Sequence, residues 1–190
     1  MSSSLADTCP LIVGLGANLP SSIGKPRQTL EALRPQLEKT IRDWLTGAIT
    51  PEVNGQSLNL RWRWSPLFET WPVGGPPGQP LYLNAVLLVD GPSLSKLIPS
   101  ETTALRLLEQ LQRLEHHFGR DRHVELERWA PRCLDLDLLA WGDFHLKHAL
   151  LTLPHPRLLE RSFVLAPLLT VITNAHDAPR RLHPQPGWPE

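Results

Sequence analysis

Two aspartates interrupt an apolar run in the second half of the chain. The stretch RWAPRCLDLDLLAWG contains Asp135 and Asp137, each flanked by leucine. In a β-strand, residues two apart point to the same face, about 6.5–7 Å apart along the backbone. We therefore expect the alternating leucines to enter the core, while Asp135 and Asp137 face a groove on the other side of the sheet.

Paired carboxylates in such a groove indicate a particular chemistry. Two carboxylates so close repel each other, which raises the pKa of one of them unless a cation lies between them. Magnesium prefers a few carboxylates together with water and substrate phosphates. Asp135 and Asp137 could therefore hold a pair of Mg²⁺ ions, although an isolated aspartate pair of this kind is more often part of an exposed sheet face.

Arginines are concentrated in the irregular segment just before this strand. Each guanidinium offers a fixed fork of donors that suits phosphate oxygens. Beside two carboxylates, they favour a site for a metal-bound polyphosphate over the alternative, in which they neutralise nearby glutamates on a solvated surface. A loop that carries arginines could also close over a nucleotide and exclude water. The arginines are Arg120, Arg122, Arg128 and Arg132, of which Arg120 and Arg132 are the leading candidates.

Other candidate motifs carry less information. His155 lies between two prolines, as turn residues often do, and is a third cationic or hydrogen-bond donor candidate for phosphate. GLGAN, at residues 14–18, lacks both the GxGxxG spacing and the lysine of a P-loop, so we expect its glycines to let the first strand turn tightly and pack close to a ligand. The histidine and cysteine spacings do not suit zinc, and no order of Ser, His and Asp indicates side-chain nucleophilic catalysis.

Hydrophobic periodicity predicts the elements that position these residues. Residues 11–18 read as a buried strand that leads into a loop at its glycines, and leucines spaced by three and four predict a helix at 26–45. Pro35 should kink or divide this helix, because proline lacks the amide donor that a helix interior requires. The remaining predictions are a polar connector at 46–57, a strand at 58–70, a Gly/Pro-rich loop at 71–80, a strand at 81–90, a helix at 101–120 with Leu105, Leu108, Leu111, Leu114 and Phe118 on its buried face, a strand at 134–142 and a short helix at 161–171.

The order of these elements indicates the fold class. Strand, helix, strand, strand, helix, strand is the βαββαβ order of a ferredoxin-like α+β sandwich, here with additional C-terminal helical turns. A chain of 190 residues is long enough for one hydrophobic core. We expect a single domain at residues 1–173, followed by a Pro-rich irregular tail at 174–190.

Composition narrows the classes of partner. Nineteen basic residues offset nineteen acidic ones, so no global field would hold the chain on nucleic acid or an anionic membrane. No stretch approaches the roughly 20 apolar residues of a membrane span, and the N-terminus lacks the pattern of a secretory signal. Two distant cysteines, Cys9 and Cys133, favour a reducing compartment. We expect a cytoplasmic monomer that binds neither nucleic acid nor membrane.

Six motifs follow one another between residues 11 and 171: GLGANL, SPLFET, QPLYLNAV, LEHHFGRDR, RWAPRCLDLDLL and LTLPHPRLLERSFVLAPL. In sequence and order they resemble the motifs of the 6-hydroxymethyl-7,8-dihydropterin pyrophosphokinase family. The chain departs from the family pattern at Ala17, Trp71, Ala130 and Cys133, where serine, proline, glycine and threonine are usual.

The resemblance implies a reaction. It is the transfer of the terminal pyrophosphoryl unit of ATP to the hydroxymethyl group of 6-hydroxymethyl-7,8-dihydropterin, with release of AMP, in folate biosynthesis. ATP is then a co-substrate, and Asp135 and Asp137 hold two Mg²⁺ ions along its triphosphate. Arg120 and Arg132 match the catalytic-loop arginines of the family, and positioning and charge neutralisation would supply most of the catalysis.

The resemblance also implies which residues bind each substrate. An aromatic ring can stack on a flat heterocycle, and an Asn amide offers a donor and an acceptor to its edge, although ordinary core packing explains the aromatics equally well. The residues that match pterin-binding positions are Thr70, Val73, Tyr82, Asn84 and Phe163. Those that match ATP-binding positions are Gln112, Glu115, Arg122, Trp129, Leu138, Thr152, His155 and Arg161.

A non-catalytic RNA-binding module is the alternative. A ferredoxin-like sheet with exposed aromatics also occurs in RNA-recognition domains. The aromatic and basic strand motif of those domains does not occur in this sequence, and Asp135 and Asp137 on a central strand would repel phosphate without metal. The sequence therefore favours the enzyme.

Overall fold

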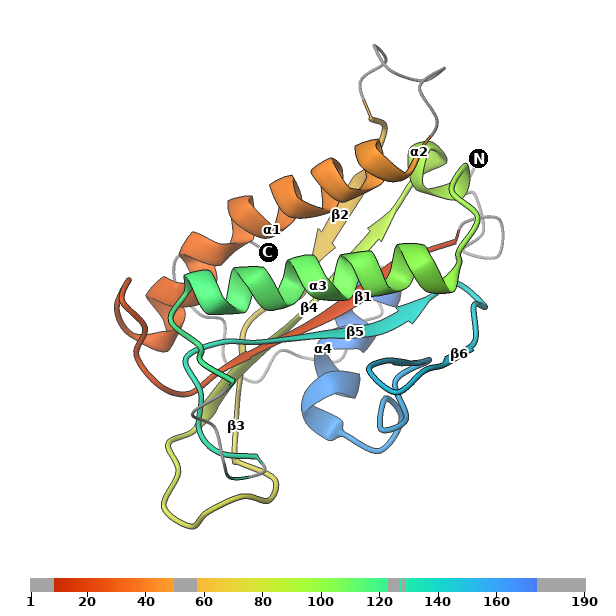
Figure 1. Ribbon diagram of the computed structural model, residues 1–190. Coiled ribbons are helices and arrows are strands. Elements are labelled where there is room, and N and C mark those ends of the chain that lie inside the picture. Colours follow the sequence, from red (N-terminus) through yellow and green to blue (C-terminus); the bar gives the residue numbers. More distant parts are fainter. Residues whose placement is uncertain (1–8, 50–57, 123–126, 128, 174–190) are drawn as a thin grey trace.

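An antiparallel sheet flanked by helices forms the described part of the protein (Figure 1). The computed structural model describes residues 9–49, 58–122, 127 and 129–173. Its elements confirm the predicted α+β class. They are β1 (Leu11–Ala17), α1 (Pro26–Ala48), β2 (Arg61–Trp64), β3 (Phe68–Thr70), β4 (Tyr82–Asp90), α2 (Pro92–Ser95), α3 (Glu101–His117), β5 (Asp135–Trp141), β6 (Leu146–Lys147), β7 (Thr152–Leu153) and α4 (Ser162–Ile172).

Some sequence predictions concern residues outside this description. The irregular tail at 174–190 and Arg128 lie outside the described residues. Most of the connector predicted at 46–57 lies outside them as well, and its first residues belong to α1, which extends to Ala48.

The main sheet has the strand order β2-β4-β1-β5, with β3 also paired to β4. The single strand predicted at 58–70 is wrong, because residues 65–67 form a bulge that separates β2 from β3. Pro66 in the bulge has no amide hydrogen for the ladder. Ser65 replaces that pairing: its N–H donates to the Val86 carbonyl oxygen at 2.9 Å, and its hydroxyl accepts from the Val86 N–H at 2.9 Å.

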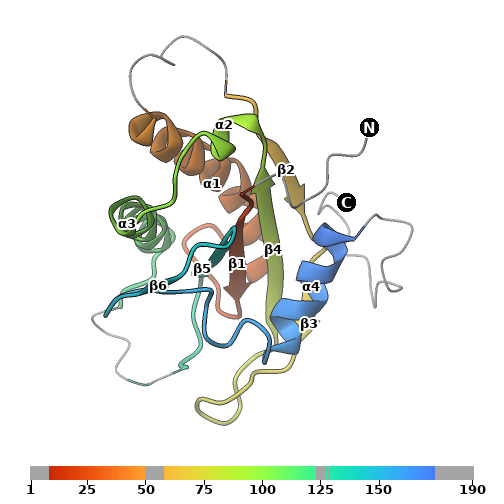
Figure 2. The ribbon, with the colours of Figure 1, turned by 90° about the vertical axis from the view of Figure 1, so that its right-hand side faces the viewer.

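Helices α1 and α3 cover one face of the sheet (Figure 2). Pro35 does not divide α1, so that alternative of the prediction is wrong. The apolar side chains on both sides of Pro35 pack against the sheet, and this packing outweighs the roughly 3 kcal/mol that an interior proline costs. The side chains predicted for the buried face of α1 are all fully buried: Leu30, Leu33, Leu37, Ile41 and Leu45.

The buried face of α3 differs slightly from the predicted one. Ala104 and Leu107 are fully buried, whereas Leu105 and Leu108 are only half-buried. The prediction placed the stripe through Leu105 and Leu108, whereas the helix is turned so that Ala104 and Leu107 face the sheet. Leu111, Leu114 and Phe118 are buried as predicted.

Helix α4 covers part of the opposite face of the sheet (Figure 2). Val164 and Leu168 of α4 pack there against Val86, Leu88 and Leu139 of the sheet. Farther along the strands, this face carries the polar residues of β4 and β5. Within the described ranges, no helix combines the length and apolar character needed to cross a bilayer.

Strand β5 has the predicted alternation. Leu134, Leu136 and Leu138 are at most 2% exposed and belong to the core under α1 and α3. Asp135 and Asp137 point to the other face, beside α4. The aspartates therefore line a groove and do not enter the apolar core.

Candidate active site

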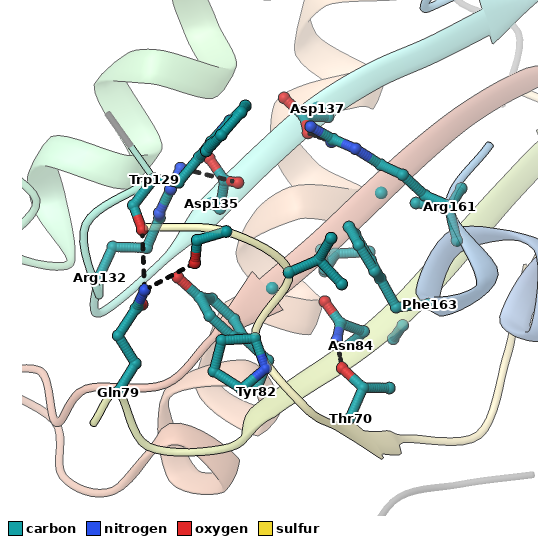
Figure 3. A pocket seen from close by; sticks show the side chains of 18 of the residues that line it. Thr70, Gln79, Tyr82, Asn84, Trp129, Arg132, Asp135, Asp137, Arg161 and Phe163 are labelled. Carbon is teal, nitrogen blue, oxygen red and sulfur yellow. Dashed lines mark hydrogen bonds and ion pairs between the residues drawn. The ribbon is translucent and has the colours of Figure 1, made fainter. Parts of the chain in front are cut away.

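A cavity of about 240 Å³ lies beside α4 on the second face of the sheet. Its walls come from β1, β3, β4 and β5, the loop at 71–80, the segment that follows α3, and the start of α4. Figure 3 shows Asp135 and Asp137 of β5 and Arg161, which directly precedes α4, at one side, and Thr70, Asn84 and Tyr82 at the other. The cavity thus brings together segments that are far apart in sequence.

Two glycines form the floor of this cavity. Gly14 of β1 pairs with Asp137, and Gly16 pairs with Asp135 on one side and Asn84 on the other. A Cβ at Gly16 would lie 3.0 Å from the Asn84 Oδ1, so a larger residue would fill the space between the strands. Strand β1 continues past both glycines, so the predicted turn at them is wrong.

The Asp135 carboxylate is matched by two arginines. Arg120 Nη1 donates to its Oδ1, and Arg132 Nη1 donates to its Oδ2 at 3.1 Å. Burial opposes ionisation of Asp135, but Arg132 and Arg120 outweigh it and lower the pKa below its ordinary value. Asp135 is therefore ionised at neutral pH.

The Asp137 carboxylate has less compensation. Its side chain is 39% exposed, and Arg161 Nη1 lies 3.9 Å from Oδ2. Burial and then the negative charge of Asp135 raise the pKa of Asp137 to about 7. The negative charge of Asp135 raises the pKa of Asp137 as the sequence predicted, but burial has the larger effect.

This pair fits a hard cation. The oxygen donors suit Mg²⁺, and a cation beside Asp137 would compensate the charge that Arg161 compensates only from 3.9 Å. In the part of the chain that the structure describes, no cluster of three or more His, Cys, Asp or Glu residues could hold a metal. Water and substrate oxygens would therefore have to complete the coordination of any ion at Asp135 and Asp137.

Glu115 anchors the arginines from behind the cavity. Its carboxylate is 1% exposed and accepts from Arg120 Nη1 at 2.7 Å, the Leu136 N–H at 2.7 Å and Arg122 Nη2 at 2.6 Å. Burial raises the pKa of Glu115, against the opposite effects of Arg120 and Arg122. Because Arg120 also reaches Asp135, a continuous chain of ion pairs leads from the interior to the cavity.

The other end of the cavity is polar and aromatic without a carboxylate pair. Asn84 is 7% exposed, and its Nδ2 donates to the Thr70 Oγ1 at 2.7 Å. The Tyr82 hydroxyl donates to the Ala130 carbonyl oxygen at 3.4 Å. Phe163, from α4, also lines this end (Figure 3). Such a surface suits a flat heterocycle with hydrogen-bonding edges.

Amide side chains connect three loops at the cavity mouth. Asn18 Oδ1 accepts from the Arg132 N–H at 2.7 Å, and its Nδ2 donates to the Pro80 carbonyl oxygen at 3.2 Å. Gln79 Nε2 donates to the Trp129 carbonyl oxygen at 3.2 Å (Figure 3). These bonds fix the segment at 129–132 relative to β1 and the 71–80 loop.

His155 is a neutral donor in this environment. Its Nδ1 accepts from the Arg157 N–H at 3.1 Å, which leaves Nε2 to carry the proton. Burial, and then the positive charge of Arg161, lower the pKa of His155. Of the two predicted possibilities, the structure therefore favours the hydrogen-bond donor over the cation.

Sequence comparison relates the chain to a known family. Residues 12–173 match the sequence model of the family described as 7,8-dihydro-6-hydroxymethylpterin-pyrophosphokinase (HPPK). The chain belongs to the HPPK family.

Curated HPPK relatives carry the name 2-amino-4-hydroxy-6-hydroxymethyldihydropteridine pyrophosphokinase. The protein of Pseudomonas aeruginosa is 34% identical over 156 residues, which cover 82% of this chain and 76% of the relative. The protein of Haemophilus influenzae is 36% identical over 110 residues (58% of this chain, 61% of the relative). The protein of Synechocystis is 42% identical over 113 residues (60% and 48%). The chain thus spans less than two thirds of the length of the latter two.

Most residues implied by the HPPK resemblance lie around the cavity. Leu138 does not line it, because its side chain is in the core and only its backbone could face a ligand. Gln112, exposed on α3, Glu115, and Thr152, in β7, do not line it either. The implied residues that do are Thr70, Val73, Tyr82, Asn84, Arg120, Arg122, Trp129, Arg132, Asp135, Asp137, His155, Arg161 and Phe163.

Sequence reasoning missed part of this HPPK site. Gln79 and Asn18 were not proposed, although they connect the loops. Arg157 was not proposed either, although its guanidinium lies 5.0 Å from the centre of the Trp129 ring. An amide beside Pro80 in a glycine-rich loop was an available signal for Gln79, whereas contacts between residues 28 or more positions apart have no local sequence pattern.

Proposed function

We propose that this HPPK chain transfers the pyrophosphoryl group of ATP to 6-hydroxymethyl-7,8-dihydropterin in folate biosynthesis. The substrate hydroxyl oxygen attacks the β-phosphorus, the bond from that phosphorus to the oxygen bridging the α-phosphorus breaks, and AMP leaves. The observation that carries the proposal is one cavity with an aspartate and arginine end beside an amide and aromatic end. These two ends suit a polyphosphate and a flat heterocycle, respectively.

The arginines neutralise the charge of the triphosphate. Arg120 and Arg132 reach the cavity beside Asp135, and Arg122 and Arg161 line it as well. Fixed guanidinium donors stabilise charge that develops on phosphate oxygens without reorganisation of water. We assign Arg120 and Arg132 as catalytic residues, and Arg122 and Arg161 as ATP-binding residues.

Other residues complete the nucleotide side. Trp129 and His155 line the cavity, where His155 can donate through Nε2. Gln112 and Thr152 belong to α3 and β7, which both contact β5, and the backbone of Leu138 in β5 would receive the adenine.

Glu115 acts through the arginines. Its oxygens are committed to Arg120, Arg122 and the Leu136 N–H, so a direct contact with nucleotide would require these bonds to break. We therefore assign Glu115 as a positioning residue.

Asp135 and Asp137 would hold two Mg²⁺ ions. The ions would neutralise the phosphate oxygens and align the triphosphate for in-line attack. Asp137 has the less compensated charge, whereas Asp135 must share its oxygens with Arg120 and Arg132.

The pterin would occupy the opposite end. Asn84 presents its amide between Thr70 and Gly16, and Tyr82 and Phe163 offer aromatic surfaces for stacking. Val73, which is 69% exposed in the 71–80 loop, would become covered on binding.

We also propose a ferredoxin-like arrangement within a single domain. The order β2-β4-β1-β5, with β3 continuing the line of β2 along β4, supports this arrangement. The formal net charge of +0 supports small-molecule substrates rather than nucleic acid, and we propose a cytoplasmic monomer.

The test is product analysis with omissions. AMP should form from ATP only when the hydroxymethyl-dihydropterin and Mg²⁺ are both present, and the pterin should gain two phosphates. Folded protein that forms no AMP under these conditions would contradict the proposal, and ADP as the product would indicate single-phosphoryl transfer instead.

A further inference from the structure

Trp129 has an unusual backbone conformation beside the cavity. Its φ angle is +60°, and among the described residues other than glycine it is the one with positive φ. Non-glycine residues adopt this region infrequently, and they keep it when surrounding contacts hold them there. The contacts around Trp129 therefore identify what fixes the segment at 129–132.

The 71–80 loop supplies one set of contacts. Gly74 and Gly75 lie so close that an added Cβ would come 2.6 Å from Trp129 Cε3 and 2.3 Å from the Trp129 carbonyl oxygen, respectively. Gln79 Nε2 donates to the same carbonyl at 3.2 Å. These contacts hold the backbone and one part of the ring.

Arg157 supplies a contact from a third segment. Its Cζ lies over the Trp129 ring, 5.0 Å from the centroid, a geometry typical of a cation–π interaction. The turn that carries Arg157 is itself anchored to β5, because the His155 N–H donates to the Leu139 carbonyl oxygen at 2.7 Å. No carboxylate in the described part of the chain forms a salt bridge with Arg157.

We propose that Arg157 is a positioning residue that keeps Trp129 docked and thereby holds Arg132 at the cavity. The link from Trp129 to Arg132 is short, since Arg132 follows three residues later and its Nε donates to the Ala130 carbonyl oxygen at 3.2 Å. Arg157 acts through the indole and not on the substrate. The docking of Trp129 is a property of the ligand-free protein and does not depend on the proposed function. Only the expected effect on turnover rests on that function.

Hydrogen exchange of the ligand-free protein tests the docking. Exchange of the Arg132 amide reports on the segment, because that amide is bonded to Asn18 at 2.7 Å. Arg157→Ala should accelerate this exchange about 2- to 5-fold, the factor expected for loss of an exposed cation–π contact, and Arg157→Lys should restore at least half of the protection. The matched control is Arg42→Ala, which removes a guanidinium 5.0 Å from the Trp62 ring away from the cavity and should leave the Arg132 amide unchanged. Equal exchange in Arg157→Ala and wild type would overturn the inference.

A double-mutant cycle tests whether Arg157 acts through Trp129. In the wild-type background, Arg157→Ala should lower kcat/KM for AMP formation about 2- to 5-fold, with the melting temperature unchanged. In the Trp129→Ala background, the same substitution should have an effect of less than about 1.5-fold. An equal loss in both backgrounds would show that Arg157 acts independently of Trp129 and would overturn the positioning role. If wild type forms no AMP, the proposed function fails, and the exchange experiment still decides the inference.

Discussion

Two buried carboxylates in this molecule each bind a pair of arginines, but the arginines of the two pairs make their further contacts in different parts of the molecule. Asp90 of β4 is 2% exposed and accepts from Arg61 Nε at 2.6 Å and from Arg63. Glu115 of α3 is 1% exposed and accepts from Arg120 and Arg122. Each cluster thus joins one buried carboxylate to two arginines.

The difference lies in the second partner of each arginine. Arg63 also donates to the Val171 carbonyl oxygen at 3.0 Å, so the Asp90 cluster ties β2 and β4 to α4. Arg120, only 4% exposed at its side chain, continues to Asp135 at the cavity. A buried ion pair therefore does not by itself indicate function. The two clusters differ in whether an arginine also contacts a residue of the cavity, as Arg120 does, or the backbone of a neighbouring helix, as Arg63 does.

The largest expected effect is loss of turnover on Asp137→Ala. The substitution removes the carboxylate whose charge is least compensated in the cavity, and with it a proposed Mg²⁺ ligand. We expect AMP formation to fall by at least about 10²- to 10³-fold, with circular dichroism and cooperative melting retained. Near-normal turnover at saturating Mg²⁺ would show that the Asp137 carboxylate has no part in the reaction.

The next effect concerns stability and should be larger at Glu115 than at Asp90. Glu115→Gln removes the buried carboxylate that binds Arg120, whose side chain is 4% exposed, whereas the arginines of Asp90 are 55% and 36% exposed. We expect Glu115→Gln to lower the free energy of unfolding by about 3–5 kcal/mol and Asp90→Asn by about 1–2 kcal/mol, measured by urea denaturation. An equal or larger loss in Asp90→Asn would contradict this difference.

A smaller effect should appear in the pH dependence of stability without metal. The pKa of Asp137 is raised to about 7, so the fold favours its protonated form. This contribution is fully present below the ordinary carboxyl pKa of about 4 and is lost as the pH rises through about 7. After discounting for the 39% exposure of the side chain, we expect a loss of about 1–2 kcal/mol between pH 5 and pH 8 in EDTA.

Asp137→Asn should remove this part of the pH dependence, and Mg²⁺ should reduce it in the wild type. The matched variant is Asp135→Asn, which removes a group whose pKa is lowered by Arg132 and Arg120 and should destabilise the protein at pH 8. An identical pH profile in wild type and Asp137→Asn would contradict the assignment of an uncompensated charge.

The smallest expected effect concerns an exposed ion pair, which serves as a reference for the two buried clusters. Lys39 and Asp43 form an exposed pair on α1, with a 2.6 Å contact and side chains 76% and 60% exposed. Lys39→Ala should change the free energy of unfolding by less than about 0.5 kcal/mol and leave AMP formation unchanged. A larger loss would indicate that solvent exposure does not separate weak pairs from strong ones in this protein.

The sequence predicted those features that local periodicity determines. Alternation with a period of two was sufficient to predict that Leu136 lies in the core and that Asp135 and Asp137 face the groove. The spacing of leucines likewise predicted the buried face of α1. The resemblance to HPPK then implied most residues that line the cavity.

Local sequence patterns could not predict the features that depend on tertiary contacts. The split between β2 and β3 depends on how residues 65–67 meet β4. The role of Glu115 depends on its burial behind Arg120, and the contact of Gln79 with Trp129 joins residues 50 positions apart. Likewise, no periodicity distinguishes Asp90 from Glu115, although only Glu115 leads to the cavity.

The most direct test of that distinction is the turnover of Glu115→Gln and Asp90→Asn, measured as AMP formation at a temperature where both proteins are folded. We expect Asp90→Asn to remain within about twofold of wild type. Glu115→Gln should lose about 10- to 100-fold in kcat, because Arg120 and Arg122 are no longer held toward the cavity. Equal turnover of the two variants would contradict the claim that the ion pairs behind the cavity position its catalytic arginines.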